Sequence, residues 1–314
     1  MVNHGSFLRY CVNSHPTEDP VGFAEAIAMI IGAHVSAAGG IGNAVDRAVD
    51  IGAEAVQIFG SSTRSWRFKP LTDAQADAFR DKNAEAGLAP PFLHAIYLIN
   101  LGNSNPENVD KSVTSLVQYM HLADQVGAGG VIFHPGSHGG AGYEGVFQQV
   151  VDSINRVLDQ TPEGPLLCLE NMAGMGQHIG AKFSELGEVM RAVDSPRLGI
   201  CLDTQHAFAA GYDLTNPDGV AGMIDEFDRD IGLDRLSAVH ANDSKRPCGS
   251  GVDRHDNIGE GLIGEQGFAN IMSHPAFADV PFFLEVPGYD KENRGPDKPN
   301  VDILKEIRAR VSRG

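Results

Sequence analysis

The chain has 314 residues, of which 42% are hydrophobic and 37 are glycine, and its formal charge at pH 7 is −17. This length suits one large α/β barrel or two ordinary domains, and no apolar run approaches the roughly 20 residues of a membrane helix. So acidic a chain is not a typical non-specific nucleic-acid binder, because such proteins are basic, although bound divalent metals would reverse the field locally.

Residues 1–28 differ from the rest because they show no clear periodicity before Val21–Met29. We expect them to form an N-terminal arm, disordered or upstream of a true start at Met29, and we expect one domain over residues 29–314. The four cysteines show no CxxC spacing, which favours small buried hydrophobic side chains in a reducing compartment. We therefore expect a cytoplasmic protein.

Short apolar runs alternate with helix-like segments along the chain, and each run has the length of a buried parallel strand. The predicted strands are Met29–Val35, Ala55–Phe59, Pro91–His94, Gly130–His134, Leu166–Glu170, Leu198–Asp203, Leu236–His240 and Pro281–Glu285. The predicted helices are Asn43–Ile51, Asp73–Ala86, Asn105–Val126, Tyr143–Gln160, Lys182–Ala192, Asp218–Ile231, Gly264–His274 and Asn300–Arg310. This alternation predicts a single-domain (β/α)8 TIM barrel. A doubly wound open sheet is the alternative, and the lack of a GxGxxG motif after the first strand weakens its dinucleotide-binding form.

Histidines and carboxylates stand at the ends of six consecutive predicted strands and in the loops that follow. They are His94, His134, Glu170, Asp203, His206, His240, Asp253, His255 and Glu285. All strand C-termini of a TIM barrel open onto one face, so these side chains would converge although they are far apart in sequence. Imidazole and carboxylate groups are preferred ligands of zinc and manganese, and these candidates exceed the roughly four ligands of one zinc ion. The pattern predicts two or three divalent metal ions.

A single histidine or glutamate at a strand end is more often a satisfied polar residue or one half of an ion pair. Here almost no lysine or arginine lies among the candidates, and unpaired buried carboxylates would be destabilising. Metal ions are the expected compensation. For His34 and His138, a structural role is slightly favoured over orienting a ligand or touching phosphate.

Several long segments resemble the bacterial endonuclease IV family of zinc-dependent AP endonucleases. They are IGAHVSAAGG (31–40), YLINLG (97–102), FHPGSH (133–138), LENMAG (169–174), CLDTQHAFAAGYD (201–213), HAND (240–243), VDRH (252–255) and GEGLIG (259–264). The resemblance implies a TIM-barrel deoxyribonuclease IV of base-excision repair that acts on double-stranded DNA. Such an enzyme uses a trinuclear zinc cluster to hydrolyse the phosphodiester 5′ to an abasic site, leaving a 3′-hydroxyl and a 5′-deoxyribose phosphate.

The resemblance also divides the candidate ligands among three zinc ions, with Mn²⁺ as an alternative at one or more positions. The first ion would be held by Glu170, Asp203, His240 and Glu285, the second by His94, His134 and a bridging Glu170, and the third by His206, Asp253 and His255. Glu170 is the implied catalytic residue because it bridges two of the ions.

Three further positions match the DNA-contacting residues of the family. Arg64 matches an arginine that enters the base stack, and Tyr97 and Leu98 match the pair that fills the gap at the lesion, as a wedge in a distorted duplex would. Without the resemblance, Tyr97 and Leu98 would be interpreted as loop packing. Gln205 stands where relatives often have cysteine, and this departure touches no candidate ligand. We expect no membrane association and no obligate protein partner.

Two other classes remain open. A divalent-metal sugar isomerase or epimerase on a related barrel would also gather histidines and carboxylates at its strand ends, but His206, Asp253 and His255 would then be surplus. A non-catalytic nucleic-acid-binding barrel would bind without cleavage, and the complete ligand set disfavours it.

Overall fold

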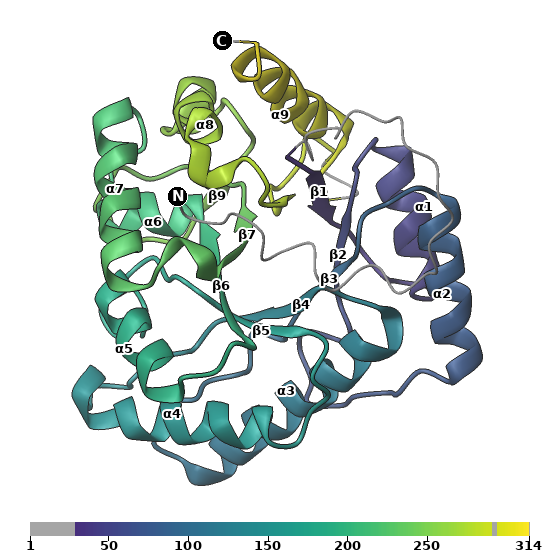
Figure 1. The fold of residues 1–314 in the computed structure, drawn as a ribbon, viewed down its shortest axis with the longest axis vertical. Coiled ribbons are helices and arrows are strands. Elements are labelled where there is room, and N and C mark those ends of the chain that lie inside the picture. Colours follow the sequence, from purple (N-terminus) through teal and green to yellow (C-terminus); the bar gives the residue numbers. More distant parts are fainter. Residues whose placement is uncertain (1–28, 291–293, 314) are drawn as a thin grey trace, which may run out of the picture.

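The computed structural model describes residues 29–290 and 294–313, and the expected arm over residues 1–28 lies outside them. Eight parallel strands close into a barrel in the order β1-β10-β7-β6-β5-β4-β3-β2, surrounded by helices (Figure 1). The strands are β1 (Ile31–His34), β2 (Val56–Phe59), β3 (Phe92–His94), β4 (Gly130–Phe133), β5 (Leu166–Glu170), β6 (Leu198–Asp203), β7 (Leu236–His240) and β10 (Phe282–Leu284). The predicted TIM barrel is confirmed, and the open sheet is wrong.

The helices that follow the strands begin and end within two residues of their predicted bounds. They are α1 (Gly42–Asp50), α2 (Asp73–Glu85), α3 (Pro106–Val126), α4 (Tyr143–Leu158), α5 (Phe183–Val193), α7 (Pro217–Asp230), α8 (Gly264–Ser273) and α9 (Lys298–Val311). Local capping explains such bounds: a capping box between Thr72 and Gln75 starts α2, and Gly127 ends α3 in the left-handed conformation. None of the described helices is long and apolar enough to cross a membrane.

Several short elements are absent from the sequence prediction. They are the helix α6 (Thr204–Ala210), the antiparallel pair β8 (Asp243–Ser244) and β9 (His255–Asp256), and the 3-10 turns η2 (Leu233–Arg235) and η3 (Pro275–Phe277). Elements this short carry no periodic signal, and tertiary contacts decide whether they form. Two of them, α6 and the β8–β9 hairpin, lie in the loops that follow β6 and β7.

Alternation along the strands produces two apolar clusters. Outward-facing side chains such as Leu93 and Val131 pack with the helices in the main core, whereas inward-facing side chains form a smaller cluster inside the barrel. We call this smaller cluster the apolar layer: Ala55, Phe92, Ile132, Cys168, Cys201, Ala238 and Phe283. A Cβ atom on Gly32 of β1 would lie 2.6 Å from the Phe283 ring, so glycine at this position leaves room for the phenylalanine.

Candidate metal centre

A polar side chain stands two residues beyond every member of the apolar layer. Since side chains alternate along a strand, a step of two residues keeps the side chain inside the barrel. We call these residues the donor layer: Gln57, His94, His134, Glu170, Asp203, His240 and Glu285. Except for Gln57, the second residue of β2, they lie at or just past the C-terminal ends of the strands, which is the face where TIM barrels carry their active sites.

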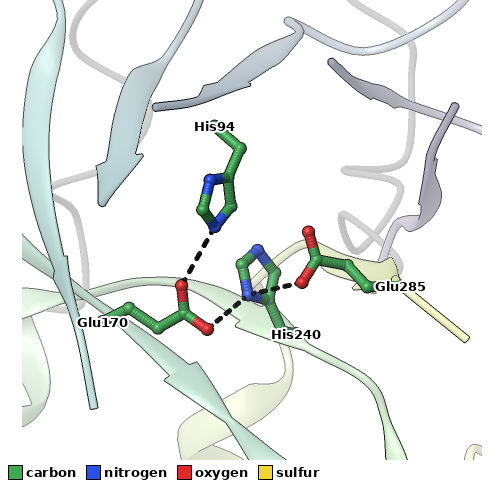
Figure 2. A group of neighbouring side chains, drawn as sticks. All are labelled: His94, Glu170, His240 and Glu285. Atoms are coloured by element: carbon green, nitrogen blue, oxygen red, sulfur yellow. Dashed lines mark hydrogen bonds and ion pairs between the residues drawn. The ribbon is translucent and has the colours of Figure 1, made fainter. Parts of the chain in front are cut away.

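Glu170 lies at the centre of the donor layer. Its Oε2 atom is 3.2 Å from His94 Nε2 and 3.0 Å from His134 Nε2, and its Oε1 atom is 3.0 Å from His240 Nδ1. His240 Nδ1 also lies 3.4 Å from Glu285 Oε2. Figure 2 shows the side chains of His94, Glu170, His240 and Glu285 pointing toward one another from different strands. Since His206 Nδ1 also lies 3.4 Å from Glu170 Oε1, this one carboxylate is within reach of four imidazoles.

A second set of donors adjoins this one beside α6 and the β8–β9 hairpin. Asp203 Oδ1 accepts a hydrogen bond from the His206 amide at 2.8 Å, so Asp203 caps α6 and sets the position of its first turn. His206 Nε2 lies 3.4 Å from Asp253 Oδ2, and His255 Nε2 lies 3.3 Å from Asp253 Oδ1. His255 Nε2 is also 3.8 Å from Asp203 Oδ2.

The structure brings all of the candidate ligands into one cluster. The groups that their distances define differ from the three ligand sets that the family resemblance implies. Donor atoms within 4.8 Å of one another form three groups: His94, Glu170, His240 and Glu285; His134, Glu170 and His206; and Asp203, His206 and His255. His94 lies with the first group in place of Asp203, and His206 belongs to two groups. Asp253 contacts the third group from the rim, with 38% of its side chain exposed.

The cluster contains four carboxylates, and among the described residues only histidines form ion pairs with them. Burial opposes the ionisation of Glu170, but His134 and His240 lower the pKa of its carboxyl well below the usual range. Burial likewise opposes protonation of His206, yet Asp203 and other nearby carboxylates raise the pKa of this imidazole well above its usual value. The centre therefore attracts positive charge strongly.

Two imidazole nitrogens in the cluster are poorly satisfied by the protein. The Nε2 atoms of His206 and His255 are both buried and have no hydrogen bond of good geometry, although Asp253 oxygens lie 3.4 and 3.3 Å away. An unsatisfied buried polar atom is destabilising, and a neutral imidazole nitrogen is a common zinc ligand. The poorly satisfied nitrogens, the surplus of carboxylate and the mixed nitrogen and oxygen donors together fit divalent metal ions at this centre.

Gln57 and His34 orient the donors on one side of the layer. Gln57 Nε2 donates to Glu285 Oε1 at 2.7 Å, and Gln57 Oε1 lies 3.0 Å from His240 Nε2. His34 Nδ1 lies 2.6 Å from the same Glu285 oxygen. Gln57 is not among the predicted site residues, although its place two residues after the apolar-layer member Ala55 is a signal in the sequence. His138, in contrast, accepts hydrogen bonds from the amides of Gly140 and Gly142 and has a structural role.

Two asparagines orient the opposite side, and the sequence analysis missed both. Asn171 Oδ1 accepts the Asp203 amide at 2.7 Å, and the Asn171 carbonyl oxygen lies 2.8 Å from His206 Nδ1. Asn242 Nδ2 donates to Asp203 Oδ2 at 2.7 Å, and its Oδ1 accepts the Glu285 amide at 2.9 Å. Such partners fix the tautomer and direction of metal-binding side chains. Their positions one residue after Glu170 and two after His240 are the signal available in the sequence.

The three candidate DNA contacts lie at the same end of the barrel. Tyr97 and Leu98 are 58% and 39% exposed, which is unusual for large hydrophobic side chains. The Tyr97 ring centroid lies 5.7 Å from that of His94 and 5.8 Å from that of His134, so this exposed tyrosine borders the cluster. Arg64 is exposed on the loop after β2 and forms no ion pair with any described residue.

Similarity to known proteins places the chain in a broad class of TIM barrels. A profile of the xylose isomerase-like TIM barrel family matches residues 45–309, so the chain belongs to that family. A D-tagatose 3-epimerase-like protein shares the fold, with a TM-score of 0.70 over 91% of this chain and 99% of that chain, at only 18% identity. Such a likeness concerns the fold alone.

Nearer relatives define the family more narrowly. The chain is 42% identical over 278 residues to a probable endonuclease 4 of Halothermothrix orenii, which covers 88% of this chain and 99% of the relative. Identity to a probable endonuclease 4 of Halorhodospira halophila is 44% over 290 residues, covering 89% and 98%. The crystal structure of endonuclease IV from Thermus thermophilus matches with a TM-score of 0.78 and 36% identity over 91% of this chain and 100% of that one. The chain belongs to the endonuclease IV family of AP endonucleases, which confirms the resemblance in its motifs.

Proposed function

We propose that this enzyme hydrolyses the phosphodiester on the 5′ side of an abasic site in double-stranded DNA, leaving a 3′-hydroxyl and a 5′-deoxyribose phosphate. The observation that carries the proposal is the donor layer together with its extension on α6 and the β8–β9 hairpin. Membership of the endonuclease IV family supports the reaction class. The free thiols of Cys168, Cys201 and Cys248 agree with a role in the cytoplasm.

The proposed cofactor is a set of three zinc ions, with Mn²⁺ as an alternative. Glu170, Asp203, His240 and Glu285 would hold the first ion, His94 and His134 the second with Glu170 shared, and His206, Asp253 and His255 the third. Bound zinc would supply Lewis-acid activation of a water molecule and would neutralise charge on the phosphate oxygens. The cluster's carboxylate surplus, with histidine as the only cationic partner among the described residues, supports this assignment.

The protein's own side chains have three tasks in this scheme. Glu170 holds the two halves of the centre together, since its two oxygens face different imidazoles. Asn171 and Asn242 keep Asp203 in one orientation from opposite sides, which prepares the centre before substrate arrives. Burial of Glu170, Asp203 and His240 keeps bulk water away from these charges and strengthens their interactions.

Recognition of the lesion is assigned to the exposed residues around the centre. Tyr97 and Leu98 would insert at the abasic gap and exclude water, and Arg64 would support the opened duplex. Arg64, Arg67 and Lys69 share the loop after β2, and none of them pairs with a carboxylate of the described residues. Cations without a protein partner remain available for phosphates, which answers the objection raised by the chain's net negative charge.

The test uses a duplex with a single tetrahydrofuran abasic analogue, incubated with the purified enzyme with and without a chelator. We expect a nick 5′ to the analogue, its loss with chelator and its recovery on addition of zinc. An undamaged duplex of the same sequence is the control. Absence of a chelator-sensitive nick at the analogue would sink the proposal.

A further inference from the structure

Asp243 is a fully buried carboxylate that belongs to none of the donor groups. Its Oδ1 atom accepts hydrogen bonds from the amides of Ser244 at 2.8 Å and Ile263 at 2.9 Å. Its Oδ2 atom accepts from Gly259 at 2.9 Å, and further bonds come from the amides of Gly261 and Gly264. No lysine or arginine of the described residues pairs with it. Backbone amides alone satisfy this buried charge.

The loop that supplies these amides is shaped around the carboxylate. Gly259 and Gly264 adopt φ values of +85° and +67°, which side chains rarely tolerate. A Cβ atom on Gly261 would lie 2.3 Å from Asp243 Oδ1, so only glycine fits there. The first residue of α8 is Gly264, and Ile263 provides no side-chain cap, so Asp243 caps this helix from a distant strand. Its negative charge also suits a helix N-terminus.

The same residue anchors the hairpin that carries two of the candidate ligands. Asp243 lies in β8 and pairs with Asp256 of β9, one residue after His255. Asp253 lies in the same hairpin, whose connecting loop also bonds to α6 through the Gly249 and Gly251 amides. One carboxylate thus ties the start of the hairpin to the loop that follows its end.

We propose that Asp243 is a positioning residue for the third group of donors, and that its carboxylate holds Asp253 and His255 where they can bind a zinc ion. This inference rests on the proposed function, because it assumes that Asp253 and His255 are ligands. A carboxylate is required because every neighbour is an N–H donor. An asparagine at this position would turn its own N–H groups toward some of these amides and leave them unpaired.

The expected consequence is selective loss of one metal ion. In Asp243→Asn the zinc affinity of one site should fall by about 10–100-fold, as for other residues that support a ligand. Zinc content after dialysis against a weak chelator should drop by about one ion per chain, while the other ions stay bound. A large excess of zinc should restore nicking activity. Zinc titration of the metal-free protein with a chromogenic competitor measures the affinity of each site independently of nicking activity.

A second variant guards against an unfolded Asp243→Asn protein. Gly261→Ala forces a methyl group against Asp243 Oδ1 and changes no donor group, so it should lower the same site's zinc affinity. The matched control is Asn105→Ala, which removes an ordinary helix cap, the 3.0 Å bond from the Glu107 amide at the start of α3. It should lower the melting temperature and leave every zinc ion bound.

Asp253→Ala separates the inference from the function on which it rests. Suppose that Asp253→Ala loses one ion, whereas the single variants Asp243→Asn and Gly261→Ala both keep wild-type zinc affinity at all sites. The positioning role is then wrong and the metal assignment stands. If Asp253→Ala itself keeps all ions, the proposed third site is wrong. Equal loss of every ion in Asp243→Asn would also overturn the inference, because the effect would then not be confined to the hairpin.

Discussion

The apolar layer and the donor layer come from the same strands, separated by one two-residue step, yet they are stabilised in opposite ways. The apolar layer is held together by packing of hydrophobic side chains, and the Phe92 and Phe283 rings within it lie 5.3 Å apart. The donor layer buries carboxylates whose only cationic partners among the described residues are histidines. Packing within the barrel is enough to stabilise the apolar layer. The donor layer needs positive charge that the strands do not supply.

The two cysteines of the apolar layer show how sharply the layers are separated. Cys168 and Cys201 immediately precede the donor layer and are each two residues from a carboxylate. Burial raises the pKa of the Cys201 thiol to about 12, even though His240 lies close by, and burial raises the pKa of Cys168 as well. Both thiols stay protonated at neutral pH and pack as small hydrophobic groups. The candidate metal ligands therefore begin directly above these thiols in the barrel.

The largest effect is expected from Glu170→Gln, which keeps the side-chain volume and removes the charge shared by His94, His134 and His240. Nicking of the abasic duplex should fall by about four orders of magnitude, or ~5.5 kcal/mol of transition-state stabilisation. Lesion binding, measured by fluorescence anisotropy, should remain. Cys168→Ala, one step down the same strand, is the matched control and should nick normally. Retained cleavage in Glu170→Gln would show that the donor layer is not the catalytic centre.

Phe283→Ala tests the other layer and should act on stability. The ring fills the space that Gly32 leaves open and is fully buried, so its removal creates a cavity. The free energy of unfolding, measured with urea on the metal-free protein, should fall by about 3–5 kcal/mol. Zinc content of the folded fraction should not change. A loss of zinc with unchanged stability would mean that the two layers are not independent.

The strands and the donor layer were predictable because both depend on patterns that a sequence displays. Each buried strand is a short apolar run, and Glu170 and Asp203 stand directly at strand ends, where the barrel topology brings them together. Gln57 is the second residue of β2 and so does not stand at a strand end, and an amide in a strand has no metal-binding signature. Its role becomes visible only through its bonds to Glu285 and His240.

Other parts of the site arise from contacts between distant segments. The β8–β9 hairpin has only two residues in each strand. The conformation of the loop after it is determined by hydrogen bonds to Asp243, not by local sequence preference. Helix α6 begins because Asp203 caps it, so one side chain serves both the helix and the candidate metal site. A sequence pattern assigns one role to each residue. Asp203 and Asp243 instead each have two, because each lies in or at the end of a strand and also caps a helix.

Gln57→Leu should have an intermediate effect. It tests whether the charged residues of the donor layer depend on the neutral Gln57 amide. The change leaves His240 Nε2 without its partner and removes a 2.7 Å bond to Glu285. Unfolding free energy should fall by about 1–3 kcal/mol, the usual result of an unpaired buried polar group. Isothermal titration with zinc should also show weaker binding. Gln57→Glu adds a charge at the same place, and stronger zinc binding in that variant would support electrostatic dependence of the layer.

The smallest effect is expected at the opposite end of the barrel, where Glu54 precedes β2. Glu54 accepts hydrogen bonds from Arg308 at 2.6 and 2.8 Å and from the Ile31 amide at 2.8 Å, and Lys305 lies 3.3 Å away. Burial opposes ionisation, but these bonds outweigh it and lower the pKa of Glu54. Here the protein provides its own compensating charge, as it does not in the donor layer.

A lowered pKa in the folded state means that ionised Glu54 stabilises the fold above its unfolded value of about 4.3, and that this contribution disappears as the pH falls through the folded pKa. Glu54→Gln should therefore lower the unfolding free energy of the metal-free protein by only ~1 kcal/mol at pH 7, because the pair is partly exposed and screened. The difference from wild type should shrink as the pH falls through the folded pKa of Glu54. Saturating zinc should leave that difference unchanged at pH 7, since Arg308 and not a metal ion balances this carboxylate. A zinc-dependent difference would instead couple the two ends of the barrel and contradict the separation of its layers.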